Sequence, residues 1–336
     1  MIKKVFVSLL CCVLIVCASM VLVRATSVLT LTVSSDSNLY DRYTTVTLHG
    51  GMDYYDYIAH QYPSDGLVGV EITDSTGAPM VIRTVRTGNS NPNSITANIA
   101  SAYLCNQGGA EQSSIPLPTA TNQVQPYYYV DVANNNGTTI PMLVTMNVYD
   151  SNGVPIALTS QMIYPGPYSD GTVLNNFNIP SWAHYGTATA YVDVYSDWPA
   201  NGGVPYGFET TFQFTITGGT PFTGTPTTTQ GASGNYSLTF RIPKTAALGT
   251  YTVYTGADYL GIYGSASTTF QVAQLGDLNG DGAVTFVDIQ IFVADYLAYY
   301  SPSHTYTAAI DFTHSGVINF NDVQLMVHYY LIYWSS

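Results

Sequence analysis

The last sixty residues of the chain contain the same twelve-residue loop pattern twice, in copies that begin at Asp277 and Asp311. In such a loop, oxygen-bearing side chains at positions 1, 3, 5 and 12 and a carbonyl at position 7 can surround Ca²⁺, which takes six to eight oxygen ligands. A glycine at position 6, here Gly282 and Gly316, permits the sharp turn. The chain is therefore expected to contain a pair of calcium loops near its C-terminus.

The two copies differ in the charge of their expected ligands. In the first copy, positions 1, 3, 5, 7, 9 and 12 are Asp277, Asn279, Asp281, Ala283, Thr285 and Asp288. In the second copy they are Asp311, Thr313, Ser315, Val317, Asn319 and Asp322. Position 7 would act through its backbone carbonyl and position 9 through a water molecule. Because hydroxyls replace Asn and Asp at positions 3 and 5, we expect the second copy to bind calcium more weakly.

Each loop leads into an apolar pattern with helical spacing. The first pattern consists of Ile289, Phe292, Val293, Tyr296 and Leu297, and the second of Val323, Met326, Val327, Tyr330 and Leu331. Two features depart from an ordinary EF-hand. Each loop closes with Asp in place of Glu, and residues 272–276 are too few to form the helix that normally enters the loop.

Those departures carry a family resemblance. Residues 276–336 resemble a type I dockerin, the module that docks onto cohesin domains of scaffolding proteins. The resemblance implies bound Ca²⁺, a cohesin-domain partner, and a role for loop positions 10 and 11 in choosing that partner. These positions are Phe286, Val287, Phe320 and Asn321. The bulky residue at position 10 of both copies can face the partner or fill the core between the helices.

The N-terminus predicts export. Lys3 and Lys4 precede an apolar run from Val5 to Val23, and Ala25 suits a signal peptidase, so residues 1–25 are expected to be a signal peptide. An apolar run of this length can also span a bilayer as an uncleaved anchor. The protein is thus expected to be secreted, or to stay attached to the cell surface if the leader is retained.

Cysteine content and charge narrow the function classes. Three of the four cysteines lie in the leader, so only Cys105 remains and no internal disulfide can form. Outside the leader, five basic residues face 21 acidic ones, a balance of −16. Such a chain would be repelled by nucleic acid and by anionic membranes. Charged residues are nevertheless sparse, at 9%, as is typical of an exported surface protein.

Residues 28–274 predict β-structure. Apolar and polar residues alternate, as at Val68, Val70 and Ile72, between turns rich in Gly, Pro, Asn and Asp. No helical pattern interrupts the alternation. The length allows two β-sandwiches of about a hundred residues each.

Two short motifs recur in an informative order. Asp-Ser-x-Gly-x-Pro occurs at 74–79 and 150–155, and Phe-x-Ile-Pro followed by Ala and Gly-Thr occurs at 177–187 and 240–250. In these motifs Gly77 and Gly153 would take a positive φ, and each proline would open a strand. This turn chemistry resembles that of immunoglobulin-like and macroglobulin-type sandwiches of microbial surface proteins.

The order of the motifs predicts one sandwich inserted into a loop of the other, since tandem domains would alternate the two motifs. We expect a host sandwich at 28–96 plus 224–274 and an inserted sandwich at 120–219. Three shorter tandem domains are the competing interpretation. The expected fold class is mainly β, with two immunoglobulin-like β-sandwiches followed by a small α-helical, dockerin-like calcium module.

No catalytic constellation is recognisable. The six histidines lack metal-ligand spacing, and no Gly-x-Ser-x-Gly motif occurs. The carboxylate pair of a glycosidase would have to come from such residues as Glu71, Asp74, Asp193, Asp197 and Glu209, and nothing in the sequence pairs any two. The 29 tyrosines can stack on sugar rings or pack within the sheets.

The sequence therefore predicts a secreted or cell-surface, non-enzymatic protein that docks through calcium-loaded loops onto a cohesin, with the sandwiches as spacer or recognition domains. Calcium would act structurally, because the six carboxylates after Gly276 face no Lys or Arg in that segment. One alternative is a component of extracellular polysaccharide degradation, either carbohydrate-binding or associated with a glycoside hydrolase. Another is an adhesin in which the calcium module is purely structural.

Overall fold

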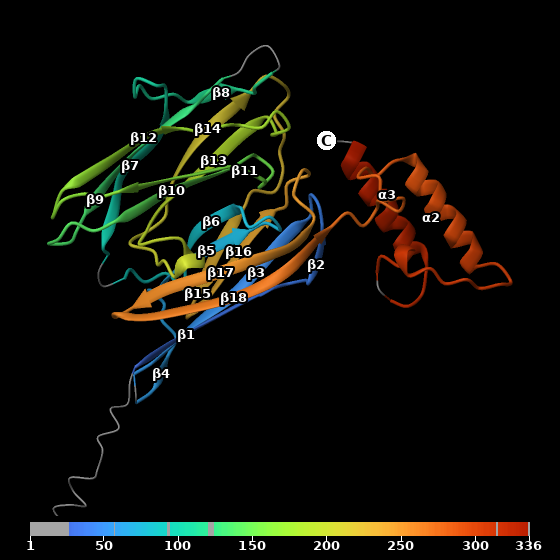
Figure 1. Ribbon diagram of the computed structural model, residues 1–336, viewed down its shortest axis with the longest axis horizontal. Helices are drawn as coiled ribbons and strands as arrows, with labels where there is room; N and C mark the ends of the chain where they lie inside the picture. The colour runs from blue at the N-terminus through green and yellow to red at the C-terminus, as the bar shows by residue number, and fades with distance from the viewer. Residues whose placement is uncertain (1–26, 57, 93–94, 120–123, 314, 335–336) are drawn as a thin grey trace, which may run out of the picture.

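The computed structural model describes residues 27–56, 58–92, 95–119, 124–313 and 315–334. Strands make up 46% and helices 11% of the structure, which confirms the prediction of a mainly β fold. Two helices lie near the C-terminus (Figure 1). The predicted signal peptide lies outside the described residues. Among the residues that are described, no helix is both long and apolar enough to cross a bilayer.

Two five-stranded sheets form what we call the lower sandwich (Figure 1). The first sheet has the order β1, β3, β16, β15, with β4 also on β3: β1 (Val28–Ser35), β3 (Thr45–Tyr55), β16 (Asn235–Arg241), β15 (Thr228–Ala232) and β4 (His60–Gln61). The second sheet runs β2 (Leu39–Asp41), β18 (Ile262–Ala273), β17 (Gly249–Tyr259), β5 (Leu67–Thr73) and β6 (Pro79–Arg86). Leu48 of β3 and Val253 of β17 belong to one buried core. Segments about 140 residues apart in sequence, β6 and β15, therefore belong to one two-sheet unit.

The remaining strands form the upper sandwich. Its five-stranded sheet runs β11 (Pro155–Ile163), β10 (Met142–Tyr149), β13 (Gly186–Tyr195), β14 (Thr210–Thr217) and β8 (Ser114–Pro116). Its three-stranded sheet runs β12 (Asp170–Asn176), β9 (Tyr127–Asn134) and β7 (Ala97–Cys105). Val130 of β9 and Met146 of β10 share its buried core. Strands β7 and β8 precede residue 120 and pair with strands that follow it.

The sheet of the lower sandwich that contains β17 and the five-stranded sheet of the upper sandwich have the same plan. In the lower sheet β2 pairs parallel with β18, and in the upper sheet β8 pairs parallel with β14, whereas every other pairing in the described sheets is antiparallel. The Asp-Ser-x-Gly-x-Pro motif makes the turn between β5 and β6 and the turn between β10 and β11. Gly77 and Gly153 adopt φ of 84° and 74°, which confirms the expected left-handed turn positions.

The sandwiches pack against each other, so that β5 and β10 are buried on nearly all positions of both faces. At this interface Arg83 of β6 donates to both carboxylate oxygens of Glu209, at 2.7 and 2.8 Å. Its guanidinium lies 3.4 Å from the centre of the Tyr191 ring. A bidentate pair stacked on an aromatic ring orders both partners, so the two sandwiches are held in a defined orientation.

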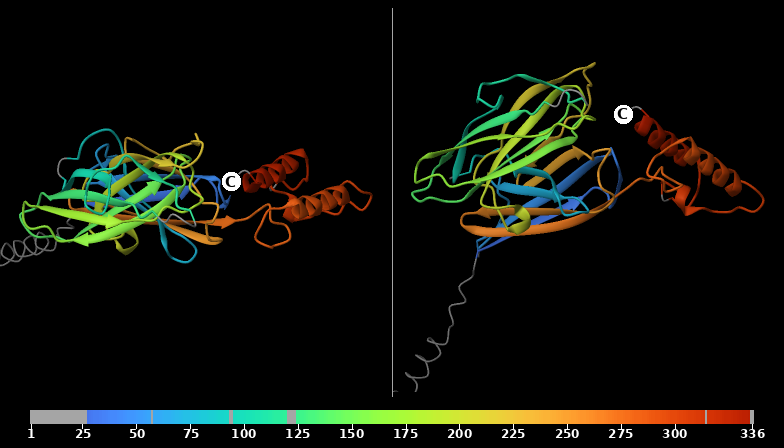
Figure 2. Two further views of the ribbon diagram at one scale, coloured as in Figure 1. Left: turned by 90° about the horizontal axis from the view of Figure 1, so that it is seen from above. Right: turned by 45° about the horizontal axis from the view of Figure 1, so that its top comes forward.

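The C-terminal helices lie side by side at one end of the molecule, beyond the sheets (Figures 1 and 2). They are α2 (Phe286–Tyr299) and α3 (Phe320–Trp334), with the short η2 (Ala308–Ile310) between them. A further short helix, η1 (Pro199–Asn201), lies between β13 and β14. Phe292 of α2 stacks on Phe312, and Phe312 meets Tyr329 of α3 edge-on, so aromatic side chains link the two helices.

Candidate functional site

The first predicted loop is folded around the carboxylate of Asp277. Its Oδ2 accepts a hydrogen bond from the backbone N–H of Gly282 at 2.8 Å, and its Oδ1 accepts one from Gly280 at 2.8 Å. Gly280 and Gly282 have φ of 74° and 87°, a left-handed conformation that favours glycine. The glycine pattern therefore curls the chain so that backbone donors converge on the residue at position 1.

The closing carboxylate of the first loop, Asp288, is fully buried. Its Oδ1 accepts from the backbone N–H of Leu278 and Asn279 at 2.9 and 3.1 Å, and its Oδ2 accepts from the N–H and hydroxyl of Thr285 at 2.7 and 3.1 Å. Burial raises the pKa of Asp288, but these backbone hydrogen bonds outweigh it and hold the pKa below its ordinary value. Thr285 also caps α2 by accepting a hydrogen bond from the N–H of Val287. The same residue therefore takes part in closing the loop and in starting the helix.

The second loop repeats this arrangement. Asp311 Oδ2 accepts from the N–H of Gly316 at 2.8 Å, as Asp277 does from Gly282. Asp322 is fully buried, and it accepts from the N–H of Thr313 at 3.0 Å and from the N–H of Asn319 at 2.8 Å. The two loops thus share one hydrogen-bonded frame although positions 3 and 5 differ.

Side-chain hydroxyls distinguish the second loop from the first. Tyr306 donates its hydroxyl to Asp311 Oδ2 at 2.7 Å, and Thr313 donates to Asp311 Oδ1 at 3.1 Å. The hydrogen bond from Tyr306 is the main reason that the pKa of Asp311 lies below its ordinary value. Ser315 donates to the carbonyl of Val317 at 2.9 Å. Both carboxylate oxygens of Asp311 and the carbonyl oxygen of Val317, which the sequence predicts to be calcium ligands, therefore accept hydrogen bonds from side-chain hydroxyls.

The donor set of both loops suits a hard cation such as Ca²⁺, because carboxylate, amide, hydroxyl and carbonyl oxygens are the ligands that it prefers. No Lys or Arg occurs between residues 276 and 336. The three ion pairs found in the described part of the chain all lie outside this segment. The segment therefore supplies no Lys or Arg that could neutralise the buried carboxylate of Asp288.

The carboxylates are nevertheless not gathered as ligands of one ion. Within the described ranges, no group of three or more His, Cys, Asp or Glu side chains is close enough to hold a metal. Asn279 donates its amide to Asp281 Oδ2 at 2.8 Å, and Asp281 Oδ1 accepts from the N–H of Ala283 at 3.0 Å. These side chains of the first loop therefore make hydrogen bonds within the loop.

The predicted partner-binding residues lie on the surface. The side chains of Phe286 and Phe320 are 60% and 66% exposed, so neither fills the core between the helices. Val287 is 49% exposed, and Asn321 is also exposed.

Each helix continues this exposed apolar strip at positions that are again 34 residues apart. They are Val293 and Leu297 on α2 and Val327 and Leu331 on α3. Only part of the apolar pattern of each helix therefore faces the core: Phe292 and Met326 are buried, whereas these four residues are exposed.

Two tyrosines that the loop pattern did not identify belong to the site. Besides Tyr306, Tyr300 at the end of α2 donates its hydroxyl to the carbonyl of Ile318 in the second loop at 2.9 Å. This contact ties the first helix to the second loop. Sequence spacing could not reveal either tyrosine, because both lie in the connection between the copies, where no repeated position fixes their role.

The carboxylates considered for catalysis take structural positions. Glu71 Oε2 accepts from the backbone N–H of Ala200 in η1 at 2.8 Å, Glu209 pairs with Arg83, and Asp193 is buried in β13. Asp74 Oδ1 accepts from the N–H of Thr76 at 2.8 Å within its turn. Burial raises the pKa of Asp193 well above its ordinary value.

Residues 275–331 match the family model of the dockerin type I domain. This match confirms the predicted C-terminal module. A comparison with curated proteins finds no match.

Solved structures with local similarity include the C-terminal domain of wzt (11% identity, 38% of this chain and 78% of that one, TM-score 0.31). Others are a β-glucosidase from Erythrobacter marinus (12%, 37% and 16%, TM-score 0.26) and the native conformation of α-2-macroglobulin from E. coli (8%, 76% and 23%, TM-score 0.23). The chain thus spans less than a quarter of the length of the latter two. With TM-scores below 0.5, these similarities support no conclusion about fold or function.

Proposed function

We propose that this protein is an exported, non-enzymatic component that docks through residues 276–336 onto a cohesin-type partner in a calcium-dependent way. The observation that carries the proposal is the match of residues 275–331 to the type I dockerin domain, together with the hydrogen-bonded frame repeated in both loops. Two buried closing carboxylates, Asp288 and Asp322, support a role for a cation in the same module.

In this proposal calcium would be held by the loop oxygens at the predicted positions. These are Asp277, Asn279, Asp281, Ala283, Thr285 and Asp288 in the first loop and Asp311, Thr313, Ser315, Val317, Asn319 and Asp322 in the second. The ion would supply positive charge to a segment without Lys or Arg, and its binding free energy would add to the stability of the fold. The hydrogen-bonded frame of the first loop is built by the chain itself, because backbone N–H groups orient the carboxylates of Asp277 and Asp288.

The docking surface in this proposal is the exposed apolar strip on each helix. Phe286 and Phe320 begin these strips, and exposed apolar residues at equivalent positions continue them along α2 and α3. Exposed aromatic residues that become buried in an interface contribute most to binding. Because the strips are equivalent, the module offers two similar surfaces to a partner.

For the rest of the chain we propose a spacer or recognition role, with the upper sandwich inserted into the lower one. The sheet topology supports this division, since the strands on either side of residues 97–217 build the same two sheets. Insertion gives two covalent connections between the sandwiches, and the Arg83 to Glu209 pair adds a third contact. Such a spacer would present the helices at one end of a stiff body.

The experiment is calcium-dependent binding of the full chain to type I cohesins encoded in the same genome, measured by surface plasmon resonance with calcium and with EGTA. The double variant Phe286→Ala/Phe320→Ala should weaken binding at least about tenfold, because alanine replacement of a central aromatic residue typically costs over 1 kcal/mol. Tyr164→Ala is the matched control, since this tyrosine is 67% exposed on the upper sandwich. Calcium-independent binding, or equal losses in the two variants, would refute the proposed docking mode.

A further inference from the structure

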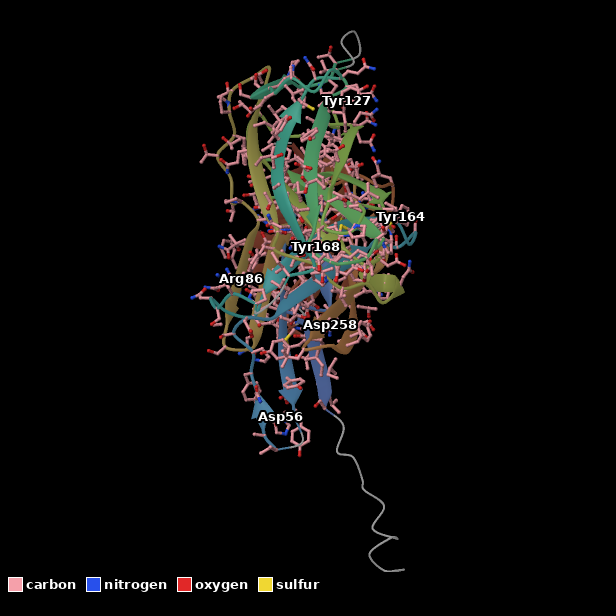
Figure 3. The ribbon with its side chains drawn as sticks, turned by 90° about the vertical axis from the view of Figure 1, so that its left-hand side faces the viewer. Asp56, Arg86, Tyr127, Tyr164, Tyr168 and Asp258 are labelled. Carbon is pink, nitrogen blue, oxygen red and sulfur yellow. The ribbon has the colours of Figure 1, made fainter. Side chains whose placement is uncertain are left out.

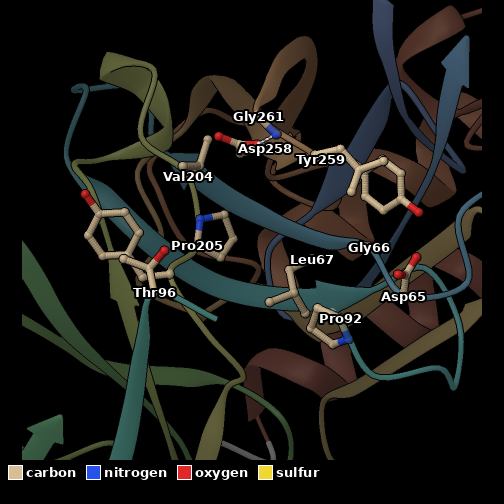
Figure 4. Close-up of a pocket in the computed structure, with 12 residues that line it drawn as sticks. Asp65, Gly66, Leu67, Pro92, Thr96, Val204, Pro205, Asp258, Tyr259 and Gly261 are labelled. Carbon is tan, nitrogen blue, oxygen red and sulfur yellow. Dashed lines mark hydrogen bonds between the residues drawn. The ribbon is translucent and has the colours of Figure 1, made fainter. Parts of the chain in front are cut away.

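A cavity of about 350 Å³ lies where the two sandwiches meet, and its lining includes no residue of α2 or α3 (Figure 4). It is lined by the turn that joins β17 to β18, the residues that begin β5, and the segment 204–206 between β13 and β14. Its volume falls at the lower end of the range of about 300–1,000 Å³ that is typical of small-molecule sites, which often form where domains meet.

The walls of this cavity are fixed by backbone hydrogen bonds. Gly66 donates its N–H to the Thr87 hydroxyl at 3.0 Å, and a Cβ at this position would lie 2.6 Å from Met52 Sδ. On the opposite wall, Tyr206 donates its N–H to the carbonyl of Val194 at 2.8 Å, and its own carbonyl accepts from Thr96 at 2.8 Å. These hydrogen bonds therefore hold both wall segments in place.

The polar lining includes two carboxylates. Asp65 and Asp258 contribute carboxylates, and Thr96 contributes a hydroxyl (Figure 4). Asp258 Oδ1 accepts from the N–H of Gly261 at 2.9 Å, which fixes its side chain at the tip of the hairpin. Neither carboxylate belongs to any of the ion pairs formed by the described residues. The Tyr259 hydroxyl is a hydrogen-bond donor to Asp65. The remaining lone pairs of the two carboxylates can accept from the hydroxyls of a ligand, whereas an anionic ligand would be repelled.

The apolar lining lies beside these carboxylates. Tyr259 is held edge-on against Tyr54, with ring centres 5.3 Å apart and an angle of 66°. Leu260 at the rim is 62% exposed and has φ of 54°, an uncommon conformation for a non-glycine residue. With Gly261, whose φ is 78°, it forms the two-residue turn between β17 and β18, a type of hairpin turn in which both residues take a positive φ. Strongly exposed tyrosines such as Tyr164 and Tyr168 lie on the upper sandwich, apart from Asp258 (Figure 3).

We propose that this cavity binds a small, uncharged saccharide. Sugar hydroxyls can donate to Asp65 and Asp258, and the apolar face of a sugar ring can pack on Tyr259, Leu260 and Pro205. The net charge of −16 outside the leader further disfavours acidic ligands. This binding activity is separate from docking through the helices, and its test is independent of calcium-dependent docking.

The test is isothermal titration of the full chain, with calcium present, against four neutral disaccharides: cellobiose, maltose, lactose and xylobiose. Galacturonic acid serves as the acidic comparison. At least one disaccharide should bind, and the double variant Asp65→Asn/Asp258→Asn should lower its affinity at least about tenfold, because charge-assisted hydrogen bonds are about twice as strong as neutral ones. Asp74→Asn is the matched control, since this aspartate makes a hairpin turn in the same sandwich outside the cavity.

Hydrogen exchange of the unmodified protein provides a second measurement that does not depend on the variants folding. The bound disaccharide should slow exchange at Gly66 and Gly261 and leave the turn at Gly77 unchanged. Absence of binding by all four disaccharides would overturn the proposal. Equal affinity in the double variant, or tighter binding of galacturonic acid than of the neutral sugars, would also overturn it.

Discussion

Tyr306 donates its phenolic hydroxyl to Asp311 Oδ2 across 2.7 Å. Asp277, the equivalent carboxylate of the first loop, accepts from the backbone N–H groups of Gly280, Asp281 and Gly282, as Asp311 does from those of Ser315 and Gly316. The second loop thus has an internal side-chain donor at the position that the sequence assigns to the first calcium ligand. A hydroxyl that occupies this oxygen competes with a cation for it.

The variant Tyr306→Phe should therefore raise the calcium affinity of the second loop a few-fold. Removing the hydroxyl leaves Oδ2 of Asp311 with the backbone hydrogen bond from Gly316 and without a side-chain donor. The ring that meets Tyr299 edge-on, with ring centres 6.3 Å apart, is unchanged. Calcium titration calorimetry of the full chain measures the change. Tyr299→Phe is the control, because it removes a neighbouring hydroxyl and leaves Asp311 untouched. A lower affinity in Tyr306→Phe would contradict the competition and indicate that the hydroxyl helps to shape the site.

Asp288→Ala should loosen the first loop even without calcium. The change removes the acceptor of four hydrogen bonds, including three from backbone N–H groups, and an unsatisfied buried donor costs about 1–3 kcal/mol. Amide hydrogen exchange at Leu278, Asn279 and Thr285 in the full chain should accelerate at least about tenfold for a loss of 1.4 kcal/mol. Asp288→Asn keeps one acceptor oxygen and should show a smaller acceleration. Unchanged exchange in both variants would mean that the carboxylate does not organise the loop.

The C-terminal module could be predicted from sequence because its constraints are local. Glycines at positions 6 of both copies, closing aspartates, and apolar residues at helical spacing each determine a short stretch of backbone, and the fold follows their order. Exposure of Phe286 and Phe320 could not be predicted. Whether an apolar side chain at a helix start is buried depends on how the two helices cross, and no short sequence pattern encodes that angle.

The interface between the sandwiches could not be predicted from the sequence, for a related reason. The alternation at Val144, Met146 and Val148 indicates a strand with one apolar face, and Thr145 and Asn147 lie on the opposite, polar face. Both of these polar residues are fully buried, because β6 packs over this face and Asn147 Oδ1 accepts from the N–H of Ile82 at 3.2 Å. A polar residue on the outer face of a strand looks the same in the sequence whether it meets water or a second sandwich.

Arg83→Met should destabilise the chain by about 3–5 kcal/mol, because removing one partner of a buried ion pair leaves the other charge uncompensated. The side chain of Arg83 is 1% exposed and that of Glu209 is 12% exposed. Urea unfolding measures the loss, and separate transitions for the two sandwiches are expected once the pair is gone. Arg86→Met is the control at the half-buried end of the same strand. An equal, small effect in both variants would show that the pair does not hold the sandwiches together.

Asp41 should make stability depend on pH. It lies at the junction with the helices, beside Leu275 and Tyr329, and burial raises its pKa to about 7. An unfolded aspartate has a pKa of about 3.9, so the folded form binds more protons between about pH 4 and pH 7. This contribution to stability is complete below the unfolded pKa and is lost as the pH rises through the folded pKa.

Thermal unfolding at saturating calcium should therefore show a decline between about pH 4 and pH 7 that Asp41→Asn removes. Comparing the variant with the unmodified protein cancels the opposite pH dependence of calcium binding, which weakens as ligand carboxylates are protonated. Asp170→Asn, at an exposed position of β12, serves as the control. Parallel pH profiles for the unmodified protein and Asp41→Asn would exclude Asp41 as the titrating group.

The most direct test of the account is a calcium titration of the full chain by calorimetry, repeated with Asp277→Ala and with Asp311→Ala. We expect two sites of unequal affinity, the tighter one lost in Asp277→Ala and the weaker one lost in Asp311→Ala. Titration of the unmodified protein without any heat of binding at millimolar calcium, or two sites that survive both substitutions, would contradict it.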